Sequence, residues 1–322
     1  MRGGTWAATR RGGPTVYAAA KNSWRGDRGP GYIAAMRTLL LTAALLVGCA
    51  EKLPESHVLP VVNAEQAFSE RSLERGTKAA FLDNLAVGSV VLDPGPVPGR
   101  AHYEAQKDVG ARLAWTPGYA EVSRGGDLGY TTGLYTRSQA DGTHFGHYVS
   151  VWRKQADGRW KVVIDGGNHH APPLQVTGKL EFRAAPVKVK RKHRPLPLAS
   201  GPELVRLQAA ERVLISAWAS GGSAALVAHG TLDLRYLPAD APLVSGRAAV
   251  ESTLTTRQDT LRFTPGGAEI ASSGDLGYSY GTATRKAGPS AAVSVGGYLR
   301  VWRRSERGVW QVALELHTMP SP

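Results

Sequence analysis

The chain has 322 residues, which is enough for two ordinary domains, with a net charge of +13 and a single cysteine. Most of the basic excess falls in residues 1–37 and 171–199, so the remainder is close to neutral and lacks the basic face of a nucleic-acid-binding domain. One cysteine excludes an intrachain disulfide bond.

Residues 1–35 are rich in glycine and arginine and show no hydrophobic periodicity. They precede Met36, which is followed at once by a secretory signal pattern. We expect this segment to be either a leader produced by a start codon assigned too far upstream or a disordered extension.

Residues 36–49 read as a signal peptide, because Arg37 is followed by an apolar run and then by Gly48 and Cys49. The apolar run is shorter than the roughly 20 residues that span a bilayer. The residues from Leu46 to Cys49 resemble the bacterial lipobox, in which the cysteine is lipidated. We therefore expect a lipid anchor at Cys49 and a location in the cell envelope, at the outer membrane facing the periplasm. A buried helix with a free thiol is the alternative.

Residues 50–61 are expected to form a tether between the lipid and the first domain. Asn63 is a candidate N-cap for a helix that ends at Gly76, and Thr77 begins a second helix. A short strand at 89–92 and a third helix at 99–106 follow. The remaining expected elements are strands at 113–123, 127–136, 145–154 and 159–168.

The segment Thr116–Tyr130 returns as Thr264–Tyr278, shifted by 148 residues. Each repeat is longer than a hundred residues, so each is a domain, with bounds expected at 62–170 and 203–318. Between them, residues 171–202 are basic and Pro-rich, as in a semi-extended linker. The second copy repeats the order of elements, with helices at 204–219, 223–227 and 246–251 and strands at 232–237, 261–271, 275–284, 292–304 and 309–318.

Helices followed by a run of antiparallel strands indicate an α+β fold. The glycines within the strands (Gly129, Gly133, Gly277 and Gly281) share one strand face, where they permit sharp bends. We therefore predict two tandem cones, in each of which N-terminal helices pack on a curved antiparallel sheet around a cavity.

The Gly-Asp-Leu-Gly-Tyr segments at 126–130 and 274–278, together with Val-Trp-Arg-Lys at 151–154 and Asp-Gly-Arg-Trp-Lys-Val at 157–162, resemble the nuclear transport factor 2-like superfamily. The nearest branch is that of the SnoaL-like and ketosteroid isomerase-like proteins of unassigned function. The resemblance covers both copies and implies a cystatin-like cone. It does not imply a reaction, because this superfamily hosts many functions.

Alternation along the last strand of the first copy puts Trp160, Val162, Ile164 and Asn168 on one face and Asp165 on the other. We expect the first face to line the cone and both Asp165 and its counterpart Glu315 to point outward. The alternative for the aromatic residues is a purely structural core. The candidate ligand-binding residues are Trp115, Tyr130, Trp152, Asn168, Phe263, Tyr278, Trp302 and Thr318.

No local motif identifies catalytic residues, a nucleotide site or a cofactor. Asp127 and Asp275 are expected to make turn hydrogen bonds, and Glu121 and Glu269 to pair with arginines. His144, His147, His169 and His170 lack the spacing of metal ligands, so no metal is expected.

The leading hypothesis is an envelope lipoprotein whose two domains bind a small apolar molecule or a protein partner, without established catalysis. The alternative is a SnoaL-like or ketosteroid isomerase-like enzyme, an isomerase, cyclase or hydrolase, acting on a small apolar substrate. The two domains are also expected to pack through their sheets as an internal pseudo-dimer.

Overall fold

The computed structural model describes residues 55–107, 110–140, 142–171, 180–183, 201–257, 260–286 and 293–320. The expected leader, the signal peptide with Cys49 and most of the expected linker lie outside these ranges. We call residues 55–183 domain 1 and residues 201–320 domain 2. Within the described part of the chain, no helix has the length and apolar character needed to cross a bilayer.

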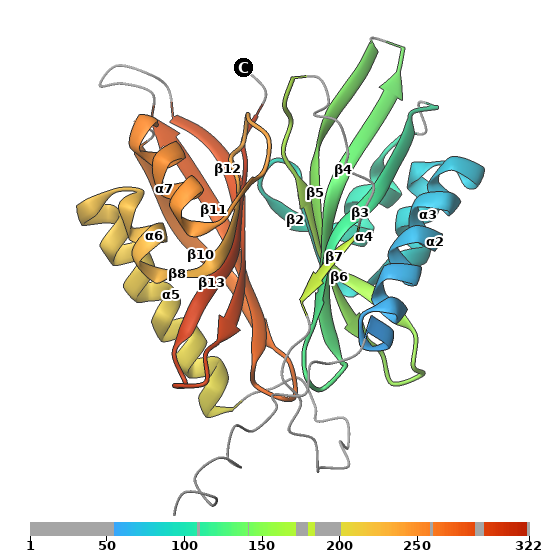
Figure 1. Ribbon diagram of the computed structural model, residues 1–322. Coiled ribbons are helices and arrows are strands. Elements are labelled where there is room, and N and C mark those ends of the chain that lie inside the picture. Colours follow the sequence, from blue (N-terminus) through green and yellow to red (C-terminus); the bar gives the residue numbers. More distant parts are fainter. Residues whose placement is uncertain are drawn as a thin grey trace, which may run out of the picture. The chain divides into compact units, whose positions relative to one another are not determined.

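Domain 1 is an α+β cone in which helices cover one face of a single sheet (Figure 1). The order of its strands across the sheet is β2-β1-β6-β5-β4-β3-β7, and β1 runs parallel to β6. The elements are η1 (Glu55–His57), α2 (Leu59–Arg75), α3 (Thr77–Asn84), β1 (Leu85–Leu92), β2 (Pro96–Pro98), α4 (Gly99–Ala105), β3 (Arg112–Val122), β4 (Leu128–Gln139), β5 (Gly142–Lys154), β6 (Trp160–Gly167) and β7 (Glu181–Arg183).

The first long helix begins earlier than the sequence suggested. It starts at Leu59, so Asn63 lies inside the helix and is not its N-cap, and helical residues occupy the end of the stretch expected as a tether. Pro60 sits in the first turn, where the missing N–H costs nothing, and Val61 and Val62 are buried. The apolar contacts of this turn therefore outweigh the polar cap signal, while the expected end at Gly76 is confirmed.

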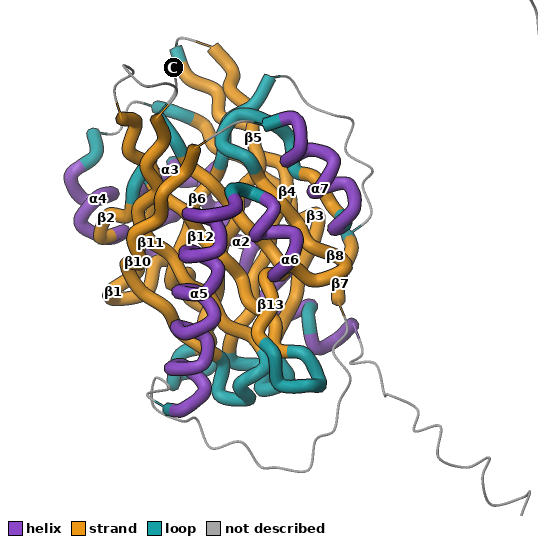
Figure 2. The backbone as a smooth tube through the Cα atoms, turned by 90° about the vertical axis from the view of Figure 1, so that its left-hand side faces the viewer, coloured by secondary structure: helices purple, strands orange, loops and turns teal. Residues whose placement is uncertain are grey.

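Domain 2 repeats the arrangement, with the strand order β10-β11-β12-β13-β8-β9. Its helices lie over one face of this sheet in the side view (Figure 2). The elements are α5 (Pro202–Gly221), α6 (Ala224–His229), β8 (Gly230–Leu237), β9 (Val244–Ser245), α7 (Arg247–Thr256), β10 (Thr260–Ile270), β11 (Leu276–Lys286), β12 (Val293–Arg304) and β13 (Trp310–Thr318). The predicted fold class, two tandem α+β cones, is confirmed.

Each sheet bends where β3 or β10 crosses its neighbour. A Cβ atom added at Gly133 would clash with the Thr116 carbonyl oxygen, and one at Gly281 would clash with that of Thr264. The pairing register shifts nearby, between Pro117 and Tyr119 and between Pro265 and Gly267. Glycine is therefore needed at these two positions because the backbones approach too closely for a side chain.

A bulge in the last strand of each domain overturns the expected assignment of strand faces. In β6, Ile164 pairs with Val151 and Val162 pairs with Trp152, which leaves Val163 as an extra residue. Ala313 is the extra residue in β13. One additional residue reverses the alternation beyond it. Ile164 therefore turns away from the helices, while Asp165 points into the cone, contrary to the prediction.

The sheet faces that the helices leave uncovered pack against each other. One buried apolar cluster contains residues from both domains, among them Tyr130, Val151, Tyr278 and Val301. Its edge is fixed by reciprocal ion pairs, since Arg153 binds Glu269 at 2.7 Å and Arg303 binds Glu121 at 2.6 Å. Equivalent residues thus exchange partners across the interface, which is the pattern of an isologous contact.

Candidate functional site

Domain 1 contains a cavity of about 180 Å³ between its sheet and helices α3 and α4. The exposed residues Gln106, Lys107 and Arg137 mark its mouth. Its walls combine aromatic side chains with polar and charged ones, as in many small-molecule sites. The aromatic residues that line it are Phe81, Tyr103, Trp115, Tyr135 and Tyr148.

Three polar side chains on adjacent strands face this cavity. Ser150 on β5 pairs with Asp165 on β6, and its hydroxyl donates a hydrogen bond of 2.7 Å to the Asp165 carboxylate. Burial raises the pKa of Asp165 to about 8, so the group is mainly a neutral carboxylic acid at pH 7. A neutral acid in a cavity can donate a hydrogen bond as well as accept one.

The third group, Tyr148, has a buried hydroxyl without a hydrogen-bond partner among the described residues. Burial raises the pKa of this phenol well above its usual value, so it stays protonated and able to donate. A buried polar group that is left unpaired costs about 1–3 kcal/mol. Because Tyr148 lines the cavity, a bound molecule could supply the missing partner.

A second carboxylate, Glu65 on α2, lies deeper in the cone and is fully buried. It accepts hydrogen bonds from the indole N–H groups of Trp115 and Trp152 and from the hydroxyl of Thr131. Burial raises the pKa of Glu65. With three donors already on its two oxygens, this group anchors the helix to the sheet and holds Trp115 in the cavity wall.

At the mouth, the hydroxyl of Tyr135 lies 2.6 Å from Nδ1 of His169 and donates to the Asn168 carbonyl oxygen at 2.9 Å. Burial and, next, the charge of Arg137 lower the pKa of His169. Behind it, Nδ1 of His147 and Nε2 of His170 are 2.9 Å apart, and burial lowers the pKa of His147 to about 4. The imidazoles of His147 and His169 are therefore mainly neutral at pH 7. No cluster of three or more metal-ligating side chains occurs among the described residues.

The corresponding space in domain 2 is filled by an ion pair. Arg300 occupies the position of Ser150 and Glu315 that of Asp165, and both are fully buried. The guanidinium binds the carboxylate through two contacts, of 2.7 and 3.1 Å, and His317 approaches the same carboxylate at 2.8 Å. Although burial opposes ionisation, Arg300 and His317 hold the pKa of Glu315 below its usual value.

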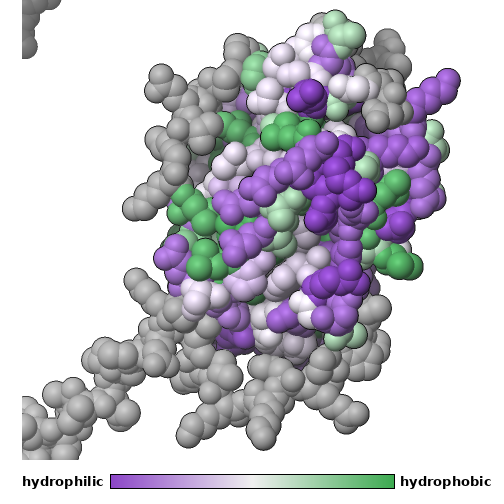
Figure 3. Space-filling view, turned by 90° about the vertical axis from the view of Figure 1, so that its right-hand side faces the viewer, coloured by the Kyte–Doolittle hydropathy of each residue, from purple (hydrophilic) through white to green (hydrophobic). Residues whose placement is uncertain are grey.

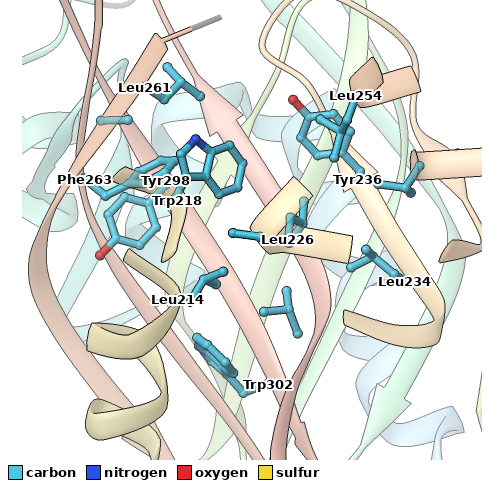
Figure 4. Close-up of a cluster of buried hydrophobic side chains, with 14 of the residues drawn as sticks. Leu214, Trp218, Leu226, Leu234, Tyr236, Leu254, Leu261, Phe263, Tyr298 and Trp302 are labelled. Atoms are coloured by element: carbon cyan, nitrogen blue, oxygen red, sulfur yellow. The ribbon is translucent and has the colours of Figure 1, made fainter. Parts of the chain in front are cut away.

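Aromatic side chains complete the filling of domain 2. The Arg300 guanidinium lies 4.5 Å from the ring centre of Phe263 and 4.3 Å from that of Tyr298. Trp218 on α5 packs edge-on against Phe263, and these rings gather between helix and sheet (Figure 4). The hydroxyl of Tyr298, the counterpart of Tyr148, donates to Glu211 at 2.7 Å. Glu315 and the Tyr298 hydroxyl are therefore engaged by other groups of this cone, although Nη1 of Arg300 has no hydrogen-bond partner among the described residues and lies 3.7 Å from Glu211.

The eight candidate ligand-binding residues lie in four different places. Trp115 is the one among them that lines the cavity. Those that belong to the interiors of the cones are Trp152, Phe263 and Trp302. Tyr130 and Tyr278 lie in the apolar cluster between the two sheets.

The last two candidates, Asn168 and Thr318, connect the domains at the rims of the cones. The Asn168 amide donates to the carbonyl oxygens of Pro238 and Ala241 at 2.6 and 2.7 Å. The Thr318 hydroxyl donates to the carbonyl oxygen of Pro94. These two side chains therefore hold the opposite domain in place.

The acids recurring in both copies also act between the domains. Glu121 and Glu269 do pair with arginines, as expected, but with arginines of the other copy. Asp127 accepts the expected turn hydrogen bond from Ser123 and a further bond from the backbone N–H of Ser272 across the interface. The repeated acids are thus explained by packing.

The groups that sequence reasoning missed at the cavity are Tyr148, Ser150 and Asp165. The error began at the bulge, since simple alternation put Asp165 outside. One signal was present: at the same place in each copy, three consecutive apolar residues (162–164 and 312–314) interrupt the alternation. Such a run is compatible with a bulged strand.

No protein-family model and no curated protein matches the chain. Among solved structures, it is similar to a ketosteroid isomerase-like protein from Erwinia carotovora atroseptica, with 18% identity and a TM-score of 0.34 over 38% of this chain and 99% of that one. A nuclear transport factor 2-like protein of unknown function from Pseudomonas putida has 16% identity and a TM-score of 0.33, over 39% and 92% of the two chains.

A nuclear transport factor 2-like protein with a cystatin-like fold from Novosphingobium aromaticivorans gives 17% identity and a TM-score of 0.30, over 36% of this chain and 80% of that one. Each of these proteins matches about a third of the chain, which is the length of one of its two copies. The solved structures similar to this chain are thus nuclear transport factor 2-like and ketosteroid isomerase-like proteins, the superfamily that the sequence motifs resemble.

Proposed function

We propose that domain 1 binds one small, largely apolar molecule in its cone and that domain 2 is a filled copy that serves as its permanent partner. The main support is the contrast between the two interiors. Tyr148 and Asp165 face a cavity with unused hydrogen-bonding capacity, whereas Tyr298 and Glu315 are fully engaged with Glu211, Arg300 and His317. A cavity lined by both aromatic and polar side chains suits a ligand of mixed character.

The test copies the filling of domain 2 into domain 1. In Ser150→Arg, the new guanidinium is expected to bind Asp165 as Arg300 binds Glu315 and to occupy the cavity. Ser150→Ala, which leaves the space open, is the matched control. The probes are 2-naphthoate and 2-naphthamide, measured by isothermal titration calorimetry. We expect one site per chain in the wild type and in Ser150→Ala, and none in Ser150→Arg.

Native mass spectrometry of the protein purified from its host envelope provides an independent readout. A small molecule retained by the wild type and absent from Ser150→Arg supports the proposal. Equal retention in both variants, provided circular dichroism shows both folded, contradicts it.

We further propose that the protein is held at the cell envelope by a lipid on Cys49. The support is the lipobox-like run from Leu46 to Cys49 after a basic residue and an apolar segment. Cys49→Ser is expected to move the protein from the membrane fraction to the soluble fraction and to stop incorporation of labelled fatty acid. Unchanged fractionation of this variant would argue against the anchor.

A second candidate function is proton transfer on a bound substrate, and one observation favours it. A carboxyl with a pKa of about 8 is close to the value that suits an acid–base catalyst near neutral pH. In the ketosteroid isomerase type of site, a carboxylate base works beside tyrosine and acid hydrogen-bond donors. Asp165 with Tyr148 would supply a base and a donor of that kind.

This candidate is tested by exchange of the α-protons of 2-tetralone for deuterium, followed by proton NMR. If Asp165 is the base, the rate rises as the pH passes through about 8 and then levels off, because only the ionised form accepts a proton. Asp165→Asn should abolish this rise. Exchange that is equally fast with both proteins would eliminate the enzymatic candidate and leave the binding proposal intact.

A further inference from the structure

Among the described residues, the arginine at the mouth of the domain 1 cavity has no acidic partner. Arg137, near the end of β4, lines the cavity, and its side chain forms no ion pair or hydrogen bond with another described residue. Its charge influences Tyr103, Tyr135 and His169, whose positions surround the opening. The positive field of Arg137 thus extends across the entrance.

No other charged group that the structure describes at the mouth forms an ion pair with Arg137. The Asp93 carboxylate, whose charge also acts on Tyr103 and His169, pairs with Nε2 of His102 at 3.0 Å. Lys78 adds positive charge, and its ammonium donates to the carbonyl oxygens of Glu104 and Gln106 at 2.8 Å each. Asp165 is mainly uncharged at pH 7 because burial raises its pKa to about 8.

The second domain shows what an arginine at this position does when no ligand is expected. Arg285 occupies the corresponding place, 148 residues later, near the end of β11. It lies 3.8 Å from Asp240, which also binds Arg257. Arg285 in the filled cone therefore has an acidic partner within the protein, whereas Arg137 in the open cone has none among the described residues.

On the basis of the proposed function, we infer that the ligand of domain 1 is an amphipathic anion. Its carboxylate or phosphate group binds Arg137 at the mouth, its apolar body lies against Phe81, Tyr103 and Trp115, and its inner end meets the Tyr148 hydroxyl. An arginine fork suits planar or tetrahedral oxyanions because it offers several N–H donors in fixed directions.

The experiment compares 2-naphthoate with the isosteric but neutral 2-naphthamide on the full chain, by isothermal titration calorimetry. The wild type should bind 2-naphthoate about 10-fold more tightly, which is the usual scale of a charge-assisted hydrogen bond. Arg137→Met should remove this preference and leave 2-naphthamide unaffected. Arg137→Lys should restore part of it, because it keeps the charge but loses the fork.

Arg285→Met is the matched control, since it removes the equivalent arginine from the filled cone and should leave both affinities unchanged. A third probe, 2-naphthyl phosphate, distinguishes the two headgroups, and tight binding of either anion supports the inference. If the wild type binds 2-naphthoate and 2-naphthamide with equal affinity, this inference alone is overturned. The same holds if Arg137→Met loses affinity for both probes equally. Binding of neither probe, with no difference from Ser150→Arg, overturns the proposed function as well.

Discussion

At the scale of single residues, two carboxyl groups in equivalent register positions have opposite protonation behaviour. Burial raises the pKa of Asp165, whose hydrogen bond comes from an uncharged hydroxyl. Glu315 is just as enclosed, yet Arg300 and His317 lower its pKa. The side chain opposite each acid, Ser150 or Arg300, decides between a neutral group facing a cavity and an ionised group in a packed core.

The first prediction concerns Asp165→Asn and pH. A carboxyl whose pKa is higher in the folded state than in the unfolded chain contributes most at low pH, and its contribution is lost as the pH rises through the folded pKa of about 8. Asparagine does not titrate, so the Asp165→Asn variant does not lose stability in this way as the pH rises. Its unfolding free energy relative to the wild type should therefore rise by about 2 kcal/mol between pH 6 and pH 8.

This difference is measured by urea unfolding at several pH values. Glu315→Gln serves as the comparison: because the pKa of Glu315 is lowered, this carboxyl is ionised in both the folded and the unfolded chain between pH 6 and pH 8, so the difference between this variant and the wild type should stay constant over this range. A constant difference between Asp165→Asn and the wild type across this range would show that Asp165 is ionised in the folded protein at pH 6.

At the scale of secondary-structure elements, close backbone contacts set the curvature of each sheet. Gly133 faces the Thr116 carbonyl oxygen and Gly281 faces that of Thr264, and both contacts lie beside an irregularity in β3 or β10. Bending at these points carries the sheet around the helices and leaves room for the cavity in domain 1.

The second prediction is that Gly133→Ala destabilises the protein by several kcal/mol, because the new methyl group clashes with backbone atoms that cannot move independently. Gly221→Ala, at the end of α5, is the matched control. There an added Cβ meets nothing within 4 Å, so the change should be neutral or stabilising by up to about 1 kcal/mol. Thermal unfolding of both variants provides the comparison, and equal midpoints would refute the steric argument.

These elements also show how far the sequence could lead. The repeat, the element order and most strand bounds were predictable because glycines, prolines and alternation are local signals. The side of β6 on which Asp165 lies was not, because the extra residue Val163 is defined only by pairing with β5. Alternation likewise indicated that Tyr130 lies on the opposite strand face from its sequence neighbours. It could not predict that this face is covered by the other domain and not by a ligand.

At the scale of the whole molecule, the two domains share one apolar interface and a reciprocal set of ion pairs. Polar residues are prominent on the face with α2 and α3 (Figure 3). On that face, Arg71 and Arg75 approach Asp83 in partly exposed pairs of little energetic weight. The unfolding free energy of the two-domain protein should therefore depend on the contact between the two sheets.

The third prediction follows from this shared cluster. Leu299, in domain 2, is fully buried between the sheets, so Leu299→Ala should cost about 2–5 kcal/mol. Because the cluster belongs to both domains, amide hydrogen exchange should accelerate in β5 of domain 1 as well as in β12. Unchanged protection of β5 in this variant would mean that the domains unfold independently.

Fusion of the two copies has a consequence for how their interiors diverge. In a dimer of identical chains, a mutation that fills the cavity of one subunit also fills the cavity of the other. Such a dimer cannot combine one open cone with one filled cone. In this protein the two copies lie in one chain and can differ in sequence. Arg300 therefore fills the cone of domain 2, while the smaller Ser150 at the equivalent position leaves the cone of domain 1 open. Every molecule then carries one cone with a cavity and one filled cone in a fixed ratio.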